Sequence, residues 1–228
     1  YYSGLLAYQL KDYAAAEKYA HKCQEAADAD DKLKKDAGEI LLFAKKDGCK
    51  TAADSAAFIS EVKTLHKANP TEDRYFNMLL SYYNEHAAEK LAWITEETTL
   101  NPQNKMAWAI KGETEMRAEK WDDAIASYKK AVEIDPNFVA VVFNIGTSLN
   151  SKAVDLKDKL ADKKTGALTV ANANKVKAIL NEAKTYLLKA QELDPERKTV
   201  NWAYALYQVY YSLGDKAKSA EYEKLANQ

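Results

Sequence analysis

The chain has 228 residues, which is enough for one extended or two compact domains with a buried core. Its 33 basic and 34 acidic residues leave a formal net charge of −1, so the totals show no bias towards nucleic acid or an anionic membrane. Seven glycines and four prolines are too few for the turns of a β-sandwich or a loop-rich enzyme, which predicts an almost entirely helical protein.

The sequence contains no clear targeting segment and only two cysteines. No apolar run approaches the ~20 residues of a membrane span. No signal peptide is visible either, but the chain opens within a repeating pattern, so cytoplasm and bacterial periplasm both remain open. Cys23 and Cys49 have no metal-binding spacing, which predicts free thiols, with a disulfide left open if they lie on adjacent helices. Only three arginines accompany thirty lysines, a bias that favours a bacterial source.

The first three segments alternate between helix-forming stretches and turn residues, which predicts helical hairpins over residues 1–28, 29–70 and 71–104. The first hairpin carries Gly4, Tyr8, Tyr13 and Ala16 at spacings that return in later segments. The second and third hairpins keep the alternation but lose most of these residues, so their helical register is open. We expect both to be degenerate copies of the same unit.

Residues 105–138 give the clearest pattern. Trp108 and Gly112 share one face of a first helix, and a turn follows near residues 119–120. In the second helix Ala124, Tyr128 and Ala131 step by four and three, which places a large ring between two small residues on one face. Proline disfavours helical geometry at the residue before it, so Asp135-Pro136 should end this helix.

The segment 139–197 is longer than its predecessor. The four prolines, at 70, 102, 136 and 195, are separated by 32, 34 and 59 residues, so the last interval exceeds the previous one by 25. Gly146 to Ala183 is also 25 residues longer than Gly112 to Ala124. This insertion predicts two helices lengthened by about 12 residues each, projecting roughly 18 Å and joined by a loop around Lys164 to Ala173. A flexible loop is the alternative.

The insertion also contains Thr165-Gly166, where glycine could take the left-handed conformation that stops a helix. The last hairpin, 198–228, then carries Trp202, Leu206 and Tyr210 in its first helix and Gly214 at its turn.

These motifs resemble the tetratricopeptide repeat family, whose 34-residue hairpin carries W-x2-L-G-x2-Y, then A-x3-F, then P. Residues 105–138 match at Trp108, Gly112, Ala124, Tyr128, Ala131 and Pro136, and they depart at Lys111 and Glu115, where Leu and Tyr are usual. The resemblance implies an all-α solenoid over residues 1–228: a single array of hairpins in a right-handed superhelix, with the first helix of each hairpin lining the concave side. An irregular helical bundle is the competing architecture.

The concave side is where the family resemblance places a partner. Carrying the helical register through each first helix gives the candidate partner-binding residues Tyr75, Leu79, Tyr82, Met106, Ala109, Glu113, Met116, Ala140, Phe143, Asn144, Thr147, Asn150, Tyr204, Gln208 and Tyr211. For any single tyrosine, contact with a partner and packing against a neighbouring repeat remain equally open. We expect Tyr75, Tyr82, Phe143, Tyr204 and Tyr211 to be partly exposed aromatics.

Some family members clamp the C-terminal carboxylate of a partner with Lys, Asn and Arg on this side. Asn144 matches one such position, but Ala109 and Glu113 stand where that clamp has Lys and Asn. A glutamate repels a terminal carboxylate, so the clamp is not expected to operate here.

Catalysis is not expected either. His21, His66 and His86 are isolated, and neither a phosphate-binding loop nor a nucleophile or metalloprotease motif occurs. Asp122-Asp123 and Glu96-Glu97 are neighbours that point about 100° apart on a helix and are typical of solvated charge or helix-start stabilisation. No cofactor and no metal are expected.

Two functions remain open. One is a non-catalytic scaffold that binds a peptide or protein on the concave face. The other is a structural assembly or oligomerisation subunit that makes contact through the projecting hairpin near residues 150–176.

Overall fold

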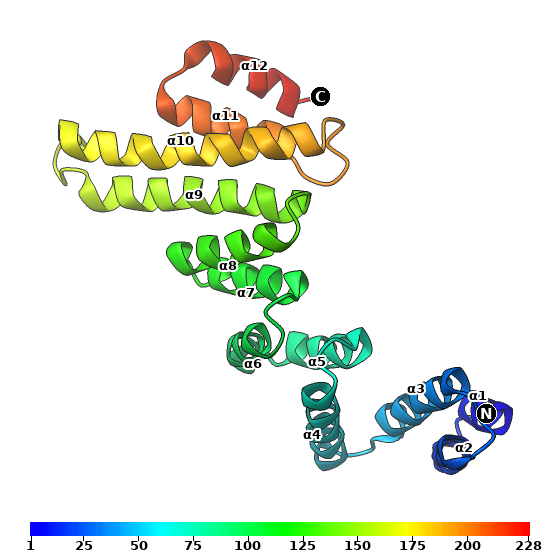
Figure 1. Cartoon of the computed structure of the whole chain (residues 1–228). Helices are drawn as coiled ribbons and strands as arrows, with labels where there is room; N and C mark the ends of the chain where they lie inside the picture. Colours follow the sequence, from blue (N-terminus) through cyan, green and yellow to red (C-terminus); the bar gives the residue numbers. More distant parts are fainter. The chain divides into compact units, whose positions relative to one another are not determined.

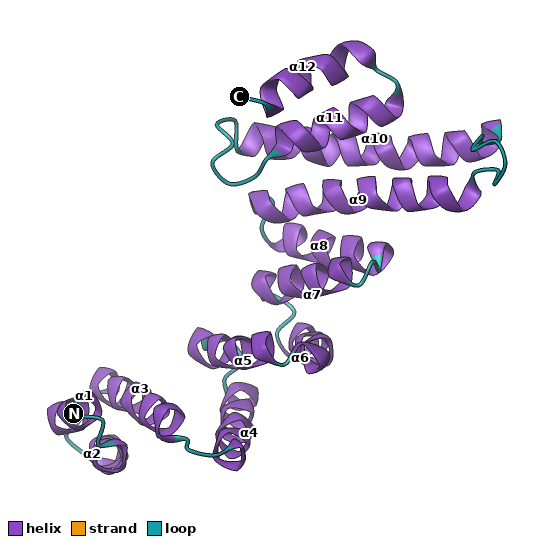
Figure 2. Cartoon of the chain, turned by 180° about the vertical axis from the view of Figure 1, so that it is seen from behind, coloured by secondary structure: helices purple, strands orange, loops and turns teal.

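The computed structural model describes residues 1–228 as twelve α-helices joined by short loops, without a β-strand (Figure 2). This agrees with the all-α prediction. The chain divides into two compact units, Tyr1–Tyr82 and Tyr83–Gln228, whereas the sequence predicted one array. The boundary falls inside α5, in the third predicted hairpin, one of the two expected to be degenerate. None of the helices has the length and apolar composition to cross a membrane.

Unit 1 contains the four helices α1 (Tyr2–Gln9), α2 (Tyr13–Glu25), α3 (Asp31–Gly48) and α4 (Ala52–Ala68), and most of α5 (Asp73–Glu85). Three of them, α1 to α3, share a core built largely from alanine and aliphatic side chains: Ala7, Ala16, Ala20, Ile40, Leu41 and Ala44. The small residues allow close helix approach. In the predicted second hairpin, α3 packs mainly against α2, and Lys45 near the end of α3 pairs with Glu61 in the middle of α4 at 2.6 Å.

Unit 2 stacks successive helices, each packed on the next (Figure 1). After the end of α5 they are α6 (Ala87–Leu100), α7 (Lys105–Arg117), α8 (Trp121–Ile134), α9 (Val139–Leu160), α10 (Val170–Leu193), α11 (Trp202–Leu213) and α12 (Lys216–Ala226). A single hydrophobic core runs from Ala124 to Tyr222 through α8 to α12. This is the stacked-hairpin solenoid that the repeat spacing predicts.

The alternation of small and large residues closes each hairpin. Tyr128 is fully buried, and a Cβ atom placed on Gly112 would lie 2.6 Å from its ring, so only glycine leaves room for that ring. The next hairpin repeats the arrangement with Leu187 opposite Gly146, where a Cβ atom would again lie at 2.6 Å. The glycine and the large residue therefore act as a pair that sets how closely the two helices approach.

The two Asp-Pro turns, at Asp135 and Asp194, are held by carboxylates that accept backbone hydrogen bonds. Asp194 accepts from the amides of Lys198, Thr199 and Val200 at 2.8 to 3.0 Å. Burial would raise the pKa of its carboxyl, but these amide bonds and the charge of Lys198 outweigh burial and hold the pKa below its usual range. In the same turn, Trp202 Nε1 donates to the carbonyl of Asp194 at 2.7 Å. The turn thereby fixes the start of α11.

The inserted segment is helical, as the spacing predicts. With 22 residues, α9 is nine residues longer than α7, and α10, with 24, is ten residues longer than α8. The loop covers residues 161–169, so the predicted position from Lys164 to Ala173 was late. Gly166 does adopt a positive φ of 69°, but it lies in a turn closed by Asp162, after α9 has already ended. Thr169 caps α10 by accepting from the amide of Asn172.

Candidate partner-binding surface

The most exposed aromatic side chains of unit 2 lie along one side of α11. Tyr204 is 51% and Tyr211 71% exposed, and Tyr207 lies between them, partly buried. Ring centroids are 6.1 Å apart from Tyr204 to Tyr207 and 6.2 Å apart from Tyr207 to Tyr211. We call these three residues the tyrosine ladder. Its members are spaced by three and four residues, so consecutive rings contact one another on a single helix face.

The opposite side of α11 is firmly packed, which holds the ladder outward. Trp202 and Leu206 are buried, and Tyr210 stacks on Tyr222 of α12 with ring centroids 5.3 Å apart. Tyr222 in turn donates to the Gln191 side chain of α10 at 3.0 Å. Gln208, predicted beside Tyr204 and Tyr211, is partly buried on the same helix.

The candidates on α9 are all partly buried: Ala140, Phe143, Asn144, Thr147 and Asn150. Phe143 packs against the core of unit 2. The amide of Asn144 donates to the Tyr128 hydroxyl at 3.5 Å, and the Thr147 hydroxyl donates to the Asn144 carbonyl at 3.2 Å. The side-chain oxygen of Asn150 is buried without a hydrogen-bond partner. This stretch of α9 is therefore mixed in polarity and only partly accessible.

On α7 the candidates differ in exposure. Met106 is 45% exposed, whereas Ala109 and Met116 are partly buried against the core. Glu113 accepts from Arg117 at 2.6 Å on the helix surface. Met116 also meets the Tyr128 hydroxyl, with the sulfur 3.8 Å from the oxygen. Burial, and after it the charge of Glu113, raise the pKa of the Tyr128 hydroxyl far above its usual range.

Sequence comparison identifies the repeat within this region. Residues 112–149, from Gly112 in α7 to Leu149 in α9, match the TPR repeat family. This segment is a tetratricopeptide repeat. The match includes Tyr128 and Gly146, the residues whose packing closes two successive hairpins.

Comparison with solved structures and with curated proteins gives weaker similarity or none. A solved structure titled "MamA MSR-1 C2" shares 18% sequence identity with the chain and superposes with a TM-score of 0.44. That similarity covers 98% of this chain and 90% of the other. No curated protein matches the chain.

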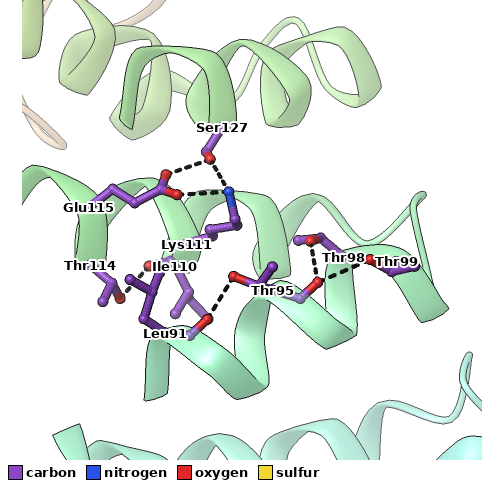
Figure 3. Close-up of polar contacts among 9 residues, drawn as sticks. All are labelled: Leu91, Thr95, Thr98, Thr99, Ile110, Lys111, Thr114, Glu115 and Ser127. Carbon is purple, nitrogen blue, oxygen red and sulfur yellow. Dashed lines mark hydrogen bonds and ion pairs between the residues drawn. The ribbon is translucent and has the colours of Figure 1, made fainter. Parts of the chain in front are cut away.

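The repeat over residues 105–138 departs from the family pattern at the partly buried Lys111 and the buried Glu115 (Figure 3). Glu115 is 5% exposed, and its carboxylate accepts from Lys111 at 2.7 Å and from the Ser127 hydroxyl at 2.6 Å. Lys111 also donates to the Ser127 hydroxyl at 3.1 Å. This closed triangle ties α7 to α8 where Leu and Tyr are usual in the family. Such a network stabilises only while every member is paired, so it fixes the registry of the two helices.

The candidates in α5 do not lie on an exposed face. Tyr75 is 8% and Leu79 1% exposed, which corrects the prediction that they line an accessible surface. They share a buried stripe with Phe76. In the sequence, this degenerate helix has apolar residues on more than one face. The prediction took its helical register from later repeats, and the face that this register picks out is the buried face. Tyr82 is partly buried.

Tyr207 was missed at the sequence level. It lies three residues after Tyr204 and four before Tyr211, so the helical spacing that selected those two also includes it. In unit 1, Cys23 and Cys49 are free thiols, and no group of three His, Cys, Asp or Glu side chains is placed to hold a metal ion in residues 1–228.

Proposed function

We propose that this chain binds a peptide or protein partner on the tyrosine ladder of α11 and the neighbouring unburied positions of α9 and α7. Tetratricopeptide repeats serve as protein-interaction scaffolds, and the chain is such a scaffold. The observation that carries the finer proposal is the exposure of Tyr204 and Tyr211, at 51% and 71%, on a helix whose other side is fully packed. Rigidly held aromatics of this kind are enriched where proteins bind one another.

The chemistry of the surface favours an extended or helical segment over a terminal carboxylate. Tyrosine offers contact area with two rotatable bonds and a hydroxyl that can donate or accept. The side chain of Asn144 contacts the Tyr128 hydroxyl, and Glu113, paired with Arg117, stands where the carboxylate clamp has Asn. These two positions therefore offer no free Asn side chain to a partner's C-terminal carboxylate. We therefore expect internal segments of a partner to bind, and no catalytic step to follow.

The test replaces two rings at once. Tyr204→Ala with Tyr211→Ala should weaken partner capture at least about tenfold, since central aromatic contacts are worth ~2 kcal/mol or more when truncated. Because both rings are exposed, the melting temperature should fall by less than about 3 °C. Quantitative mass spectrometry of proteins captured by the wild type and by the variant measures the first effect, and calorimetry measures the second.

The matched control removes two exposed rings elsewhere, by Tyr2→Ala with Tyr19→Ala on α1 and α2. Capture by this control should equal that of the wild type. Unchanged capture by the α11 variant would contradict partner binding on the tyrosine ladder. A large loss of its stability would show that the ladder residues serve packing instead.

A second candidate function is a structural assembly subunit that makes contact through the extended hairpin. The observation that favours it is the exposure of Val170, at 79%, and Val154, at 47%. Light scattering over a hundredfold range of concentration separates the two functions. A monomer at all concentrations favours the scaffold, and a concentration-dependent oligomer that the Val154→Gln, Val170→Gln variant abolishes favours assembly.

A further inference from the structure

An apolar cleft lies where the extended hairpin passes the C-terminal end of α11. It has a volume of about 300 Å³, and its apolar lining includes Val154 of α9, Leu168 of the loop, Val176 and Leu180 of α10, and Leu213 of α11. Figure 1 shows the lengthened α9 and α10 running past the neighbouring helices on the side where this loop lies. The tyrosine ladder does not contribute to the lining.

The cleft exists because neighbouring elements differ in length. The 12-residue helix α11 ends at Leu213, and Gly214 after it adopts the left-handed conformation with φ 77° and turns the chain back. By contrast, α10 has 24 residues, so its first turns, which contain Ala173 and Val176, extend past the end of α11. No helix of the stack covers this part of the hairpin, and Val154 is left 47% exposed.

Unpaired positive charge surrounds the cleft. Residues 151–180 contain seven lysines and three aspartates, a net charge of +4 in a chain whose total is −1. Lys152 pairs with Asp122 and Lys159 with Asp155. The other five lysines form no ion pair: Lys157, Lys163, Lys164, Lys175 and Lys177. Two of these five, Lys157 and Lys177, line the cleft itself, together with a single acidic residue, Asp158.

We propose that this cleft binds a segment of a protein partner that inserts apolar side chains and carries Asp or Glu residues beside them. Apolar walls favour the insertion of aliphatic side chains, and the unpaired lysines favour acidic flanks. A volume of about 300 Å³ lies at the lower end of small-ligand pockets, so it accommodates a few side chains of one segment.

The same observations disfavour other anionic partners. Single-stranded nucleic acid is held by aromatic stacking together with basic residues, and no aromatic residue lines the cleft. A membrane-binding helix needs a broad apolar face at the surface. Here Val176 and Leu180 are buried, Val154 and Val170 are the hairpin's only exposed large apolar residues, and the tip, Lys163 to Gly166, is polar and exposed. An acid-flanked apolar segment fits both the lining and the charge.

The first experiment selects ligands without assuming a partner. The bait is the full chain with Tyr204→Ala and Tyr211→Ala, so binding to the tyrosine ladder is removed and the outcome is independent of the proposed function. A phage-displayed library of random 16-residue peptides is panned at 100 mM NaCl. Enriched peptides should combine apolar residues with neighbouring Asp or Glu. Enrichment of neutral or basic peptides, or no enrichment, overturns the proposal.

The second experiment places the selected peptide on the cleft with two charge-reversal variants of equal net charge. Lys157→Glu with Lys177→Glu should weaken binding at least tenfold by fluorescence anisotropy, because both side chains line the cleft. Lys163→Glu with Lys164→Glu, at the exposed tip, should weaken it less than about threefold. Equal effects of the two variants would mean that only general charge attraction operates, and they would overturn the assignment to this cleft.

The apolar contribution and the competing partners have their own readouts. Val154→Gln should weaken the selected peptide at least about fivefold, whereas no effect overturns apolar insertion. Vesicles containing 30% phosphatidylserine and a 20-nucleotide single-stranded RNA should not displace the peptide at 100 mM NaCl. Displacement by either one overturns the choice of a protein segment.

Discussion

Gly112→Ala tests the packing that closes the matched repeat. The added Cβ atom would lie 2.6 Å from Tyr128 Cδ1 and 2.7 Å from Cε1, about 1 Å closer than carbon atoms ordinarily approach. Tyr128 is fully buried, and its hydroxyl meets Met116 and Asn144, so the ring has no space into which to move. Alanine gains about 1 kcal/mol over glycine in a helix, while overpacking against a ring that cannot move should cost the upper part of the usual range, about 2–3 kcal/mol. We expect unit 2 to lose about 1–2 kcal/mol of stability.

Tryptophan fluorescence measures this effect in unit 2 alone. All four tryptophans, at 93, 108, 121 and 202, lie in that unit. With a urea dependence near ~2 kcal/mol per molar, the unfolding midpoint of the variant should fall by about 0.5–1 M. An unchanged or raised midpoint would refute the argument, because it would mean that the two helices tolerate a side chain between them.

Gly38→Ala is the matched control. Gly38 also lies in the middle of a helix, α3, but the nearest atom to its added Cβ is Gln24 Nε2, the flexible end of a side chain, at 3.1 Å. We expect unit 1 to keep its stability or to gain up to about 1 kcal/mol, measured by circular dichroism. If both alanine variants were destabilised equally, close packing at Gly112 would not be the cause.

Three further predictions follow from the same structure. Glu115→Ala should lower the stability of unit 2 by about 2–3 kcal/mol, because it leaves Lys111 unpaired. Lys111→Leu with Glu115→Leu should be as stable as the wild type to within about 1 kcal/mol, or more stable. Urea unfolding measures both variants, and a double variant less stable than Glu115→Ala would contradict the prediction. Asp194→Ala should weaken unit 2 at neutral pH, and since the folded pKa of Asp194 is lowered, the difference from wild type should persist above about pH 4 and vanish as pH falls through that lowered pKa; a difference that stays constant as pH falls from about 4 to the acid end of the folded range would contradict the assignment. Residues 156–174 can be excised and the ends joined by a short glycine-containing turn. Unit 2 should stay folded, because the buried Ala153 and Val176 remain, and its helical circular dichroism should fall in proportion to the length removed. Global unfolding would show that the removed segment belongs to the core.

The repeat packing could be predicted because it leaves a strict spacing in the sequence. Gly112 and Tyr128 must meet once per hairpin, so a small residue and a large one recur at fixed distances. Comparison of these fixed spacings also placed the 25-residue insertion between Gly146 and Ala183, where the structure has two longer helices. Where close packing restricts a position to one size of side chain, the spacing of such residues in the sequence is enough to predict the packing.

Other features depend on tertiary contacts that spacing alone does not contain. From the sequence, Lys111 and Glu115 are only two opposite charges four residues apart. Their network, in which Glu115 is buried, depends on Ser127, which lies on the next helix. The end of α9 falls at Leu160 because Asp162 closes a turn there, although Gly166 is the stronger local stop signal. Tyr75 lies in a helix with apolar residues on more than one face, so its burial was not decided by sequence.

The chemistry of the candidate surface was partly predictable. Tyr204 and Tyr211 were chosen by register and are exposed, while Phe143 and Thr147 were chosen by the same rule and are half-buried. Register gives the direction of a side chain, but exposure depends on the size and position of neighbouring helices. Partner binding on this surface remains a proposal.

Oxidative footprinting of the intact chain, with and without a captured partner, tests the central claim most directly. Hydroxyl radicals modify exposed tyrosine rings, and mass spectrometry reads each position separately. We predict that Tyr204, Tyr207 and Tyr211 lose most of their reactivity when the partner is bound, while Tyr2 and Tyr19 keep theirs. Full reactivity of the tyrosine ladder in the bound state would contradict the proposal that the partner binds there.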